Sequence, residues 1–280
     1  MIDIVTVVFQ EELPVLKIQA QSIDLYCQDI GIKNIYVLVN DNDSVVNAID
    51  IAWWGSLQEL VRIIPRSLFS TCYINNGWVT QQVLKLLGSS LSYNKWSLVL
   101  DAKTIISSHW SLDKMFNSQG ALTCGWGPRI PVFAPAYKIA NDLFGCDNQE
   151  ILLPSGVPFF FCNTEVRQMI AEVEYRTKQD FPLWFQQQGM LTEFVLYATW
   201  IKHQFGDQQL LYADPDVTWL KTSNICHSLV DQFDQVISQV DKDTLTLSVH
   251  RQAWTQLSSS QQQRFKQLLV SRGITLGSQL

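Results

Sequence analysis

The chain opens with Ile2-Asp-Ile-Val-Thr-Val-Val-Phe9, a nearly continuous run of β-branched and apolar residues. Such a run is typical of a strand whose two faces are both covered, as in the parallel sheets of α/β proteins. From residue 13 to residue 26 the apolar side chains recur every three or four positions, which predicts an amphipathic helix that ends before Gly31. A second buried strand is expected at residues 35–39. This β-α-β order predicts a doubly wound α/β sheet, in which ligands bind beyond the carboxyl ends of the strands.

Later segments extend this pattern. We expect further strands at residues 61–64, 96–100, 121–124, 157–162 and 244–250, and helices at residues 78–87, 164–173, 191–204 and 261–269. No internal repeat, flexible linker or low-complexity tract marks a second domain. We therefore expect one α/β domain over residues 1–255, with residues 256–280 as a helical extension of the same domain.

The composition is that of a globular protein. Hydrophobic residues make up 47% and charged residues 16% of the 280 residues, which is ample apolar material for a core. The formal net charge of -6 argues against a duplex-coating protein, which needs a basic face to displace counterions from phosphates. Nucleic acids are therefore not among the expected partners.

Three features of the sequence indicate a cytoplasmic protein. The 6 cysteines are widely spaced and form no CxxC pair, which argues against a zinc site or a dense disulfide scaffold. Met1 leads straight into the first strand without the basic segment of a signal peptide. No apolar run reaches the roughly 18 residues that a membrane-spanning helix needs. Any membrane contact is expected to be peripheral, through tryptophan side chains or a lipid-linked acceptor.

The segment with the most chemical content is Trp96-Ser-Leu-Val-Leu-Asp101-Ala-Lys103, a buried strand that ends in an acid and a base. Charges at such a place are costly to bury unless they are partnered. In sugar transfer from a nucleoside diphosphate, the leaving group is stabilised by a divalent cation or by fixed positive side chains. Asp101 is thus a candidate ligand of a metal or a ribose, and Lys103 a candidate partner of phosphate. The alternative is that Asp101 caps the loop and Lys103 points into solvent.

Three further motifs accompany this strand: Gly77-Trp-Val-Thr-Gln-Gln-Val-Leu-Lys85-Leu86, Thr192-Glu-Phe-Val-Leu-Tyr197 and Leu247-Ser-Val-His250-Arg251. Taken in order over about residues 1–255, the motifs resemble the glycosyltransferase-like family DUF6492 and, more distantly, GT-A enzymes of the glycogenin type. The resemblance implies a GT-A-like fold, with a doubly wound, mixed, mostly parallel sheet flanked by helices. It also implies transfer of a sugar from a nucleotide-sugar donor to a glycan, lipid-linked or other surface-glycoconjugate acceptor in polysaccharide biosynthesis.

The resemblance places the donor at the carboxyl ends of the first, second and fourth strands. In the related enzymes the first strand and its loop lie beside the nucleobase and ribose, and a late histidine contacts metal or diphosphate. The donor-binding candidates are Thr6, Phe9, Glu11, Lys85, Asp101, Lys103, His250 and Arg251.

Lys103 stands where the second acid of the related Asp-x-Asp motif normally binds the cation. Two models follow for the charge that faces the donor. In the first, Asp101 and His250 bind Mn²⁺ or Mg²⁺, although this set is poorer in hard oxygen ligands than these ions prefer. In the second, which we favour, Lys103, Lys85 and Arg251 supply the positive charge without a metal.

Glu193 and Asp101 are the catalytic candidates. Because the helix around Glu193 is otherwise apolar, we expect burial to raise the pKa of its carboxyl group toward a value useful for proton transfer. Glu193 is then expected to deprotonate or orient the acceptor hydroxyl, and the alternative is a structural ion pair. Aromatic rings stack on the apolar faces of sugars, so the acceptor-binding candidates are Tyr73, Trp78 and Trp126.

Two alternative functions fit parts of this pattern. A catalytically degenerate protein of the same fold would bind a nucleotide or glycan without turning it over, and Lys103 in place of an acid favours this alternative. A nucleotidyltransferase would carry a glycine-rich phosphate loop after the first strand, but residues 9–14 contain no glycine.

Overall fold

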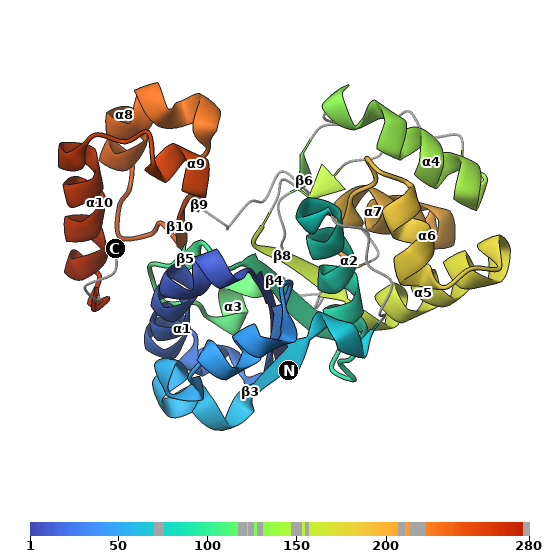
Figure 1. Ribbon diagram of the computed structural model, residues 1–280, viewed down its shortest axis with the longest axis horizontal. Helices are drawn as coiled ribbons and strands as arrows, with labels where there is room; N and C mark the ends of the chain where they lie inside the picture. Colours follow the sequence, from blue (N-terminus) through green and yellow to red (C-terminus); the bar gives the residue numbers. More distant parts are fainter. Residues whose placement is uncertain are drawn as a thin grey trace.

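The computed structural model describes residues 1–69, 76–116, 122, 126–127, 131–146, 153–154, 157–206, 211–212 and 222–276. These residues form a central sheet, a layer of helices and a smaller C-terminal unit (Figure 1). None of the helices in this described part of the chain has the length and apolar character needed to cross a membrane.

In the described part of the chain, the central sheet has five strands in the order β3-β2-β1-β4-β8. Their bounds are Ile2–Val8 for β1, Ile32–Val39 for β2, Val61–Pro65 for β3, Trp96–Asp101 for β4 and Phe159–Cys162 for β8. Strands β1 to β4 run parallel to their neighbours, whereas β8 is antiparallel to β4. All 7 residues of β1 are buried, as expected for the middle strand of a sheet that is covered on both faces. The predicted fold class, a mixed and mostly parallel sheet flanked by helices, is confirmed.

Helices α1 (Leu13–Tyr26) and α2 (Gly77–Ser90) cover opposite faces of this sheet (Figure 1). The chain steps from β1 to β2 in one direction and from β3 to β4 in the other, so right-handed crossovers put the two helices on different sides. Helix α2 approaches the sheet closely at Gly88, where a Cβ atom would lie 2.7 Å from Leu38 and 2.8 Å from Val5. Any larger side chain at this position would push α2 away from β1 and β2.

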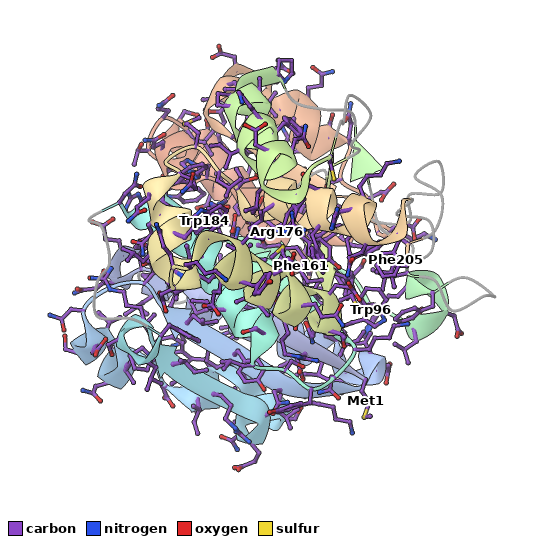
Figure 2. All side chains as sticks on the ribbon, turned by 90° about the vertical axis from the view of Figure 1, so that its right-hand side faces the viewer. Met1, Trp96, Phe161, Arg176, Trp184 and Phe205 are labelled. Atoms are coloured by element: carbon purple, nitrogen blue, oxygen red, sulfur yellow. The ribbon has the colours of Figure 1, made fainter. Side chains whose placement is uncertain are left out.

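A helical layer packs beside α2 and contains α4 (Ala134–Phe144), α5 (Asn163–Thr177), α6 (Phe181–Gln187) and α7 (Glu193–Phe205). Figure 2 faces this layer, where Phe161 of β8 is fully buried and Trp184 of α6 is nearly so. Thr192 fixes the start of α7, because its side chain accepts a hydrogen bond from the Val195 amide at 3.1 Å. This cap fixes the next residue, Glu193, as the buried first residue of α7.

The C-terminal unit has its own small sheet and its own apolar core. Strands β5 (Thr104–Ile106), β10 (Thr246–Val249) and β9 (Thr222–Ile225) form the sheet, with β10 antiparallel to β5 and parallel to β9. Helices α8 (Phe233–Ser238), α9 (Arg251–Trp254) and α10 (Ser259–Ser271) pack on it. Strand β5 directly follows β4, so the turn at residues 102–103 joins the central sheet to this unit. The expected helical extension at residues 256–280 contributes α10 to the second core.

Shorter elements complete the described chain. They are η1 (Gln10–Glu12), η2 (Gln28–Ile30), η3 (Asp43–Ala48), η4 (Ile51–Leu60), η5 (Arg66–Leu68), α3 (Leu112–Met115), β6 (Trp126–Gly127), η6 (Pro131–Phe133), β7 (Leu153–Pro154) and η8 (His227–Gln232). The predicted strand at residues 121–124 falls mostly outside the described residues.

Candidate functional site

Strand pairing brings two distant segments together at the turn after β4. The antiparallel register between β10 and β5 pairs Ser248 with Thr104. The residues that follow β10, His250 and Arg251, therefore arrive beside the Asp101–Lys103 turn that precedes β5. The same turn lies where the strand order changes direction, between β1 and β4, and such switch points are the usual ligand sites of doubly wound sheets.

A cleft of about 830 Å³ opens at this edge of the sheet. Its size is that of a cavity that binds a small organic ligand. Its walls come from the loop after β1, the end of β2, the start of α2, the turn after β4 and the segment after β10. Among the described residues they are Phe9, Gln10, Glu11, Glu12, Asp41, Gly77, Trp78, Gln81, Lys103, His250, Arg251 and Gln252.

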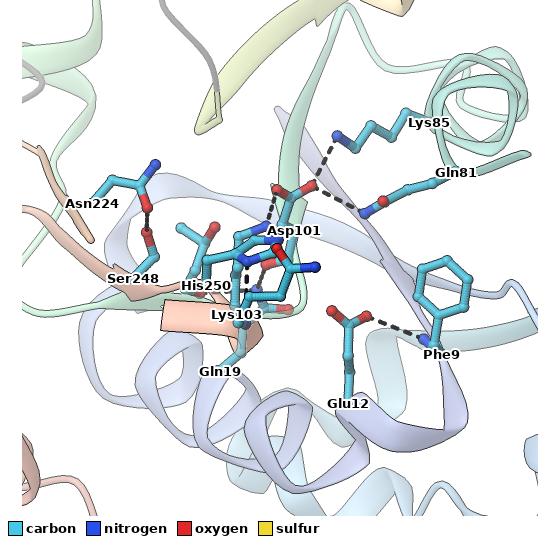
Figure 3. A network of polar contacts seen from close by, with 12 residues as sticks. Phe9, Glu12, Gln19, Gln81, Lys85, Asp101, Lys103, Asn224, Ser248 and His250 are labelled. Carbon is cyan, nitrogen blue, oxygen red and sulfur yellow. Dashed lines mark hydrogen bonds and ion pairs between the residues drawn. The ribbon is translucent and has the colours of Figure 1, made fainter. Parts of the chain in front are cut away.

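Two side chains of helix α1 hydrogen-bond to the backbone around the turn after β4. The side-chain amide of Gln19 donates to the carbonyl oxygen of Asp101 at 2.6 Å and to that of Thr104 at 2.9 Å (Figure 3). Ser22, one turn further along α1, accepts a hydrogen bond from the Ile106 amide at 3.0 Å. Both side chains are fully buried, so these bonds hold the backbone around Asp101 in one place.

Asp101 is the centre of a buried charge cluster, which we define as Asp101, Lys85, Lys103 and Glu193. Its Oδ2 atom lies 2.8 Å from Lys103 Nζ, and its Oδ1 atom lies 2.8 Å from Lys85 Nζ (Figure 3). The side-chain amide of Gln81 also donates a hydrogen bond to Oδ1, at 3.2 Å. Each carboxylate oxygen thus has an ammonium partner.

Lys85 links Asp101 to Glu193 within this charge cluster. Lys85 Nζ lies 2.9 Å from Glu193 Oε1, and the two side chains are only 4% and 1% exposed. With its amide nitrogen turned toward the carboxylate, Gln82 donates to the same oxygen at 2.8 Å. Glu193 therefore lies behind Lys85, away from the cleft.

Burial and the ion pairs of the charge cluster shift the pKa values of Asp101, Lys85 and Glu193. Burial disfavours the charged form of Asp101, but Lys85 and Lys103 together outweigh it and hold the pKa of Asp101 far below its ordinary value. Burial also disfavours the ammonium of Lys85, yet Asp101 and Glu193 outweigh it and raise the pKa of Lys85. Burial raises the pKa of Glu193, and Lys85 offsets only part of that rise. Asp101 and Lys85 consequently stay charged at neutral pH.

The charge cluster does not fit a divalent cation at Asp101. Both carboxylate oxygens are engaged by ammonium groups, which would also repel a metal ion. The Nδ1 atom of His250 accepts a hydrogen bond from the backbone amide of Gln252 at 3.3 Å and so caps α9. Among the residues that the structure describes, no group of three or more His, Cys, Asp or Glu side chains is placed to hold a metal. The expected pair of Asp101 and His250 therefore gains no third ligand from the described residues.

Aromatic and acidic side chains form the other side of the cleft. The ring of Phe9 packs against α2, where a Cβ atom at Gly77 would lie 2.9 Å from it. Trp78 is 42% exposed and also lines the cleft. Asp41, which lies just after β2, accepts a hydrogen bond from the backbone amide of Gln10 at 3.2 Å. This side of the cleft is suited to a flat ring and to hydroxyl groups.

Glu12 is a site residue that the sequence reasoning missed. Its Oε2 atom accepts a hydrogen bond from the Phe9 amide at 3.3 Å, which turns the carboxylate toward the cleft (Figure 3). Burial raises the pKa of Glu12, while the Phe9 amide and the nearby Lys103 lower it in part. The sequence carries no clear signal for this contact, because Phe9 stands where the capping-box pattern has Ser or Thr.

The structure brings only some of the expected residues to the cleft. Phe9, Glu11, Trp78, Lys103, His250 and Arg251 line it, with Arg251 in an ion pair with Glu11. Asp101 and Lys85 lie behind Lys103, and Glu193 lies deeper still. Thr6 is fully buried inside β1 and does not line the cleft. Tyr73 and the side chain of Trp126 lie outside the described residues.

Comparisons with known proteins give one family match and several structural ones. A family model described as "Family of unknown function (DUF6492)" matches residues 5–260. A sequence comparison with curated proteins finds no match. Among solved structures, the galactosyltransferase LgtC in complex with donor and acceptor sugar analogs is 13% identical, with 99% of this chain and 98% of that chain covered and a TM-score of 0.48.

Two further solved structures are similar at the same identity. An active-site mutant of LgtC has 13% identity and a TM-score of 0.45, covering 96% of this chain and 95% of that chain. Mouse xyloside xylosyltransferase 1 in its apo form has 13% identity and a TM-score of 0.42, covering 88% of this chain and 97% of that chain.

Proposed function

The chain belongs to the family DUF6492, and from its site we propose that it is a glycosyltransferase, which moves a sugar from a nucleotide-sugar donor to a glycan, lipid-linked or other surface-glycoconjugate acceptor. The observation that carries this proposal is the cleft at the switch point of the sheet, which combines aromatic rings, carboxylates and fixed cations. We assign the activity to polysaccharide biosynthesis in the cytoplasm, and the free thiols of Cys27, Cys146, Cys162 and Cys226 support a reducing compartment.

A nucleotide-sugar matches the three kinds of group in the cleft. Phe9 and Trp78 offer ring faces to a nucleobase. Glu11 and Asp41 can accept hydrogen bonds from ribose hydroxyls. Lys103, with His250 and Arg251 nearby, faces the remaining part of the cleft and can pair with the two phosphates. No single one of these groups is specific to a nucleotide-sugar. Their combination in one cleft is what supports the proposed donor.

Lys103 has the central electrostatic role in the proposed reaction. The bond between the anomeric carbon and the phosphate oxygen breaks, and the electron pair leaves with the nucleoside phosphate. Positive charge held near that oxygen stabilises the transition state. Asp101 holds the ammonium group of Lys103 at this place through its Oδ2 atom. The proposed reaction therefore proceeds without a metal cofactor, because this chain's own ammonium group supplies the charge.

Glu12 is the carboxylate that we propose to receive the acceptor proton. The acceptor hydroxyl loses its proton as its oxygen bonds to the anomeric carbon, and a carboxylate with a raised pKa is suited to take it. Glu12 lines the cleft, whereas Glu193 is 1% exposed behind Lys85. We therefore assign Glu193 a positioning role through Lys85 in place of the base role expected from the sequence.

The first test is ligand binding measured by thermal unfolding. We expect one of UDP, GDP, CDP, CMP or their sugars to stabilise the protein, by about 2.7 kcal/mol at a concentration a hundred times Kd. Addition of EDTA should leave this stabilisation unchanged, and Mn²⁺ should not increase it. Release of nucleotide from the stabilising sugar donor in the presence of an acceptor would then establish transfer. Absence of stabilisation by every nucleotide and nucleotide-sugar would overturn the proposal, and binding without turnover would support the degenerate alternative.

The second test is the pH dependence of Glu12→Gln. We expect kcat/KM of the unaltered protein to fall as the pH drops through the raised pKa of Glu12, because the base must be ionised. The charged side chains that act on the pKa of Glu12 are Lys103, Asp101 and Lys85, and the last two stay charged in this range. Glu12→Gln should lower kcat/KM by roughly 10²- to 10⁴-fold and remove the acidic limb of the profile.

Glu59→Gln is the control, because Glu59 is an exposed glutamate outside the cleft. It should leave both the rate and the pH profile unchanged. A Glu12→Gln variant with an unchanged acidic limb would rule out Glu12 as the proton acceptor.

A further inference from the structure

A second cavity lies between α1 and the C-terminal unit and has a volume of about 210 Å³. We call it the apolar pocket. Its walls include Val15 and Ile18 from α1, Val249 from β10, and Trp254, Phe265 and Leu269 from α9 and α10. Trp254 and Phe265 meet edge to face, with ring centroids 6.0 Å apart. The apolar pocket is thus an aromatic and aliphatic cavity on the side of α1 that faces the C-terminal unit.

The apolar pocket adjoins the cleft. Four residues line both cavities: Glu11, Glu12, Lys103 and Arg251. Two of them, Lys103 and Glu12, are the groups to which we assign charge stabilisation and proton transfer. A molecule seated in the apolar pocket would therefore extend toward the reacting end of the donor.

The chemistry of the walls restricts the occupant. The inner wall residues Ile18, Ile105 and Leu269 are at most 3% exposed. Of the charged wall residues, Glu11 and Arg251 are more than 60% exposed and so lie toward solvent. Glu12 and Lys103 lie at the junction with the cleft, and the Lys266 ammonium lies over the Trp254 ring, 5.9 Å from its centroid. A sugar ring or a phosphate pushed into this interior would lose its hydrogen bonds to water without replacing them. A nucleobase would leave its polar edges unpaired for the same reason. The occupant that fits is an alkyl or aryl group.

We propose that the apolar pocket binds the apolar aglycone of the acceptor, so that the substrate class is an amphiphile in which an alkyl or aryl group is joined to the hydroxyl-bearing part. This inference rests on the proposed function, because it places the acceptor hydroxyl at the junction with the cleft, beside Glu12. The hydroxyl oxygen bonds to the anomeric carbon, its proton passes to the Glu12 carboxylate, and the nucleoside phosphate leaves. No further reactant is required.

The size of the apolar pocket sets the expected length of the aglycone. Its 210 Å³ is somewhat more than the roughly 150 Å³ of an engineered apolar cavity that binds benzene, a ring of six carbons. A chain of about seven or eight carbons would fill it. Each methylene buried should strengthen binding by about fourfold, until the cavity is full.

The test is calorimetric binding of a series of n-alkyl β-glucosides, from methyl to decyl, kept below their micellar concentrations. We expect the affinity to rise by about fourfold per methylene up to roughly the octyl member and to level off after it. Val15→Phe should fill part of the apolar pocket without disturbing the core, because Val15 is only half-buried. It should lower the affinity for octyl glucoside by about tenfold or more, and leave nucleotide binding in the cleft within about twofold.

Val46→Phe is the matched control, since Val46 is also half-buried but lines neither cavity. Its thermal midpoint and its glucoside affinities should follow those of the unaltered protein. An affinity that does not depend on chain length, or one that Val15→Phe leaves unchanged, would overturn the inference. Nucleotide stabilisation in the same samples separates this outcome from a failure of the proposed function, which would remove nucleotide binding and leave the chain-length dependence in place.

Discussion

Replacing Lys103 by alanine is expected to lower kcat/KM for sugar transfer by roughly 10²- to 10³-fold, the loss typical of removing one transition-state partner. Lys103 supplies a positive charge that lines the cleft, and the other ammonium of the charge cluster, Lys85, is buried behind it. The expected loss is in kcat more than in KM, because the charge on the leaving phosphate increases in the transition state. Steady-state kinetics with the donor found by thermal unfolding would measure it.

Two variants serve as references for Lys103→Ala. Lys103→Arg keeps the charge and should retain more activity than the alanine variant, although arginine hydrogen-bonds in a different geometry. Lys33→Ala removes an exposed lysine near the amino end of β2, far along the strand from the cleft, and should leave the rate unchanged. A loss of activity with EDTA that Mn²⁺ restores would contradict the metal-free model directly.

Replacing Lys85 by methionine is expected to lower the free energy of unfolding by about 3–5 kcal/mol, which is the usual effect of breaking a buried ion pair from one side. The variant leaves Glu193 buried without a cation and removes one of the two ammonium partners of Asp101. Urea unfolding at pH 7 would measure the change. Lys138→Met is the control, because its ion pair with Asp142 is exposed and its loss should change stability by at most about 1 kcal/mol.

The double variant Lys85→Met with Glu193→Gln should recover part of this loss, since it removes the unpaired charge as well. Lowering the pH should likewise recover part of the stability that the single variant Lys85→Met has lost. Burial raises the folded-state pKa of Glu193, so its unfavourable contribution is absent below the unfolded pKa near 4.3 and increases as the pH rises through the folded value. If the free energy of unfolding that Lys85→Met loses stayed the same at every pH, this account would be contradicted.

Local sequence patterns predicted most of the central sheet. The apolar periodicity placed the first helix at residues 13–26, which are the bounds of α1. Strand β2 begins at Ile32, three residues before the prediction, because the exposed Lys33 and the half-buried Asn34 interrupt the apolar run. The C-terminal unit was harder to predict. Its strand β9, Thr222–Ile225, is short and mostly polar, and it is held in place by pairing with β10 rather than by its own pattern.

The candidate site was predicted less completely, because its geometry depends on contacts between distant segments. The motif at His250 and Arg251 reaches the Asp101 turn only through the register of β10 with β5. Thr6 was expected at the donor, but it lies two residues inside the end of β1, and the residues that reach the cleft come after the strand ends. The apolar helix around Glu193 predicted burial, and the structure shows this. The pattern alone does not say whether a buried carboxylate faces a lysine or a substrate.

The ion pair between Asp101 and Lys103 also bears on how the reaction would end. The fraction of sites that hold a metal ion depends on the free concentration of the ion relative to its Kd, and the ion can depart together with the product. Lys103 is part of the chain and is present in every folded molecule, whatever the supply of ions. When the nucleoside phosphate has formed, Asp101 Oδ2 is the competing anion for the same ammonium group. We therefore expect Asp101 to compete with the product phosphate for Lys103 and to speed the departure of the product.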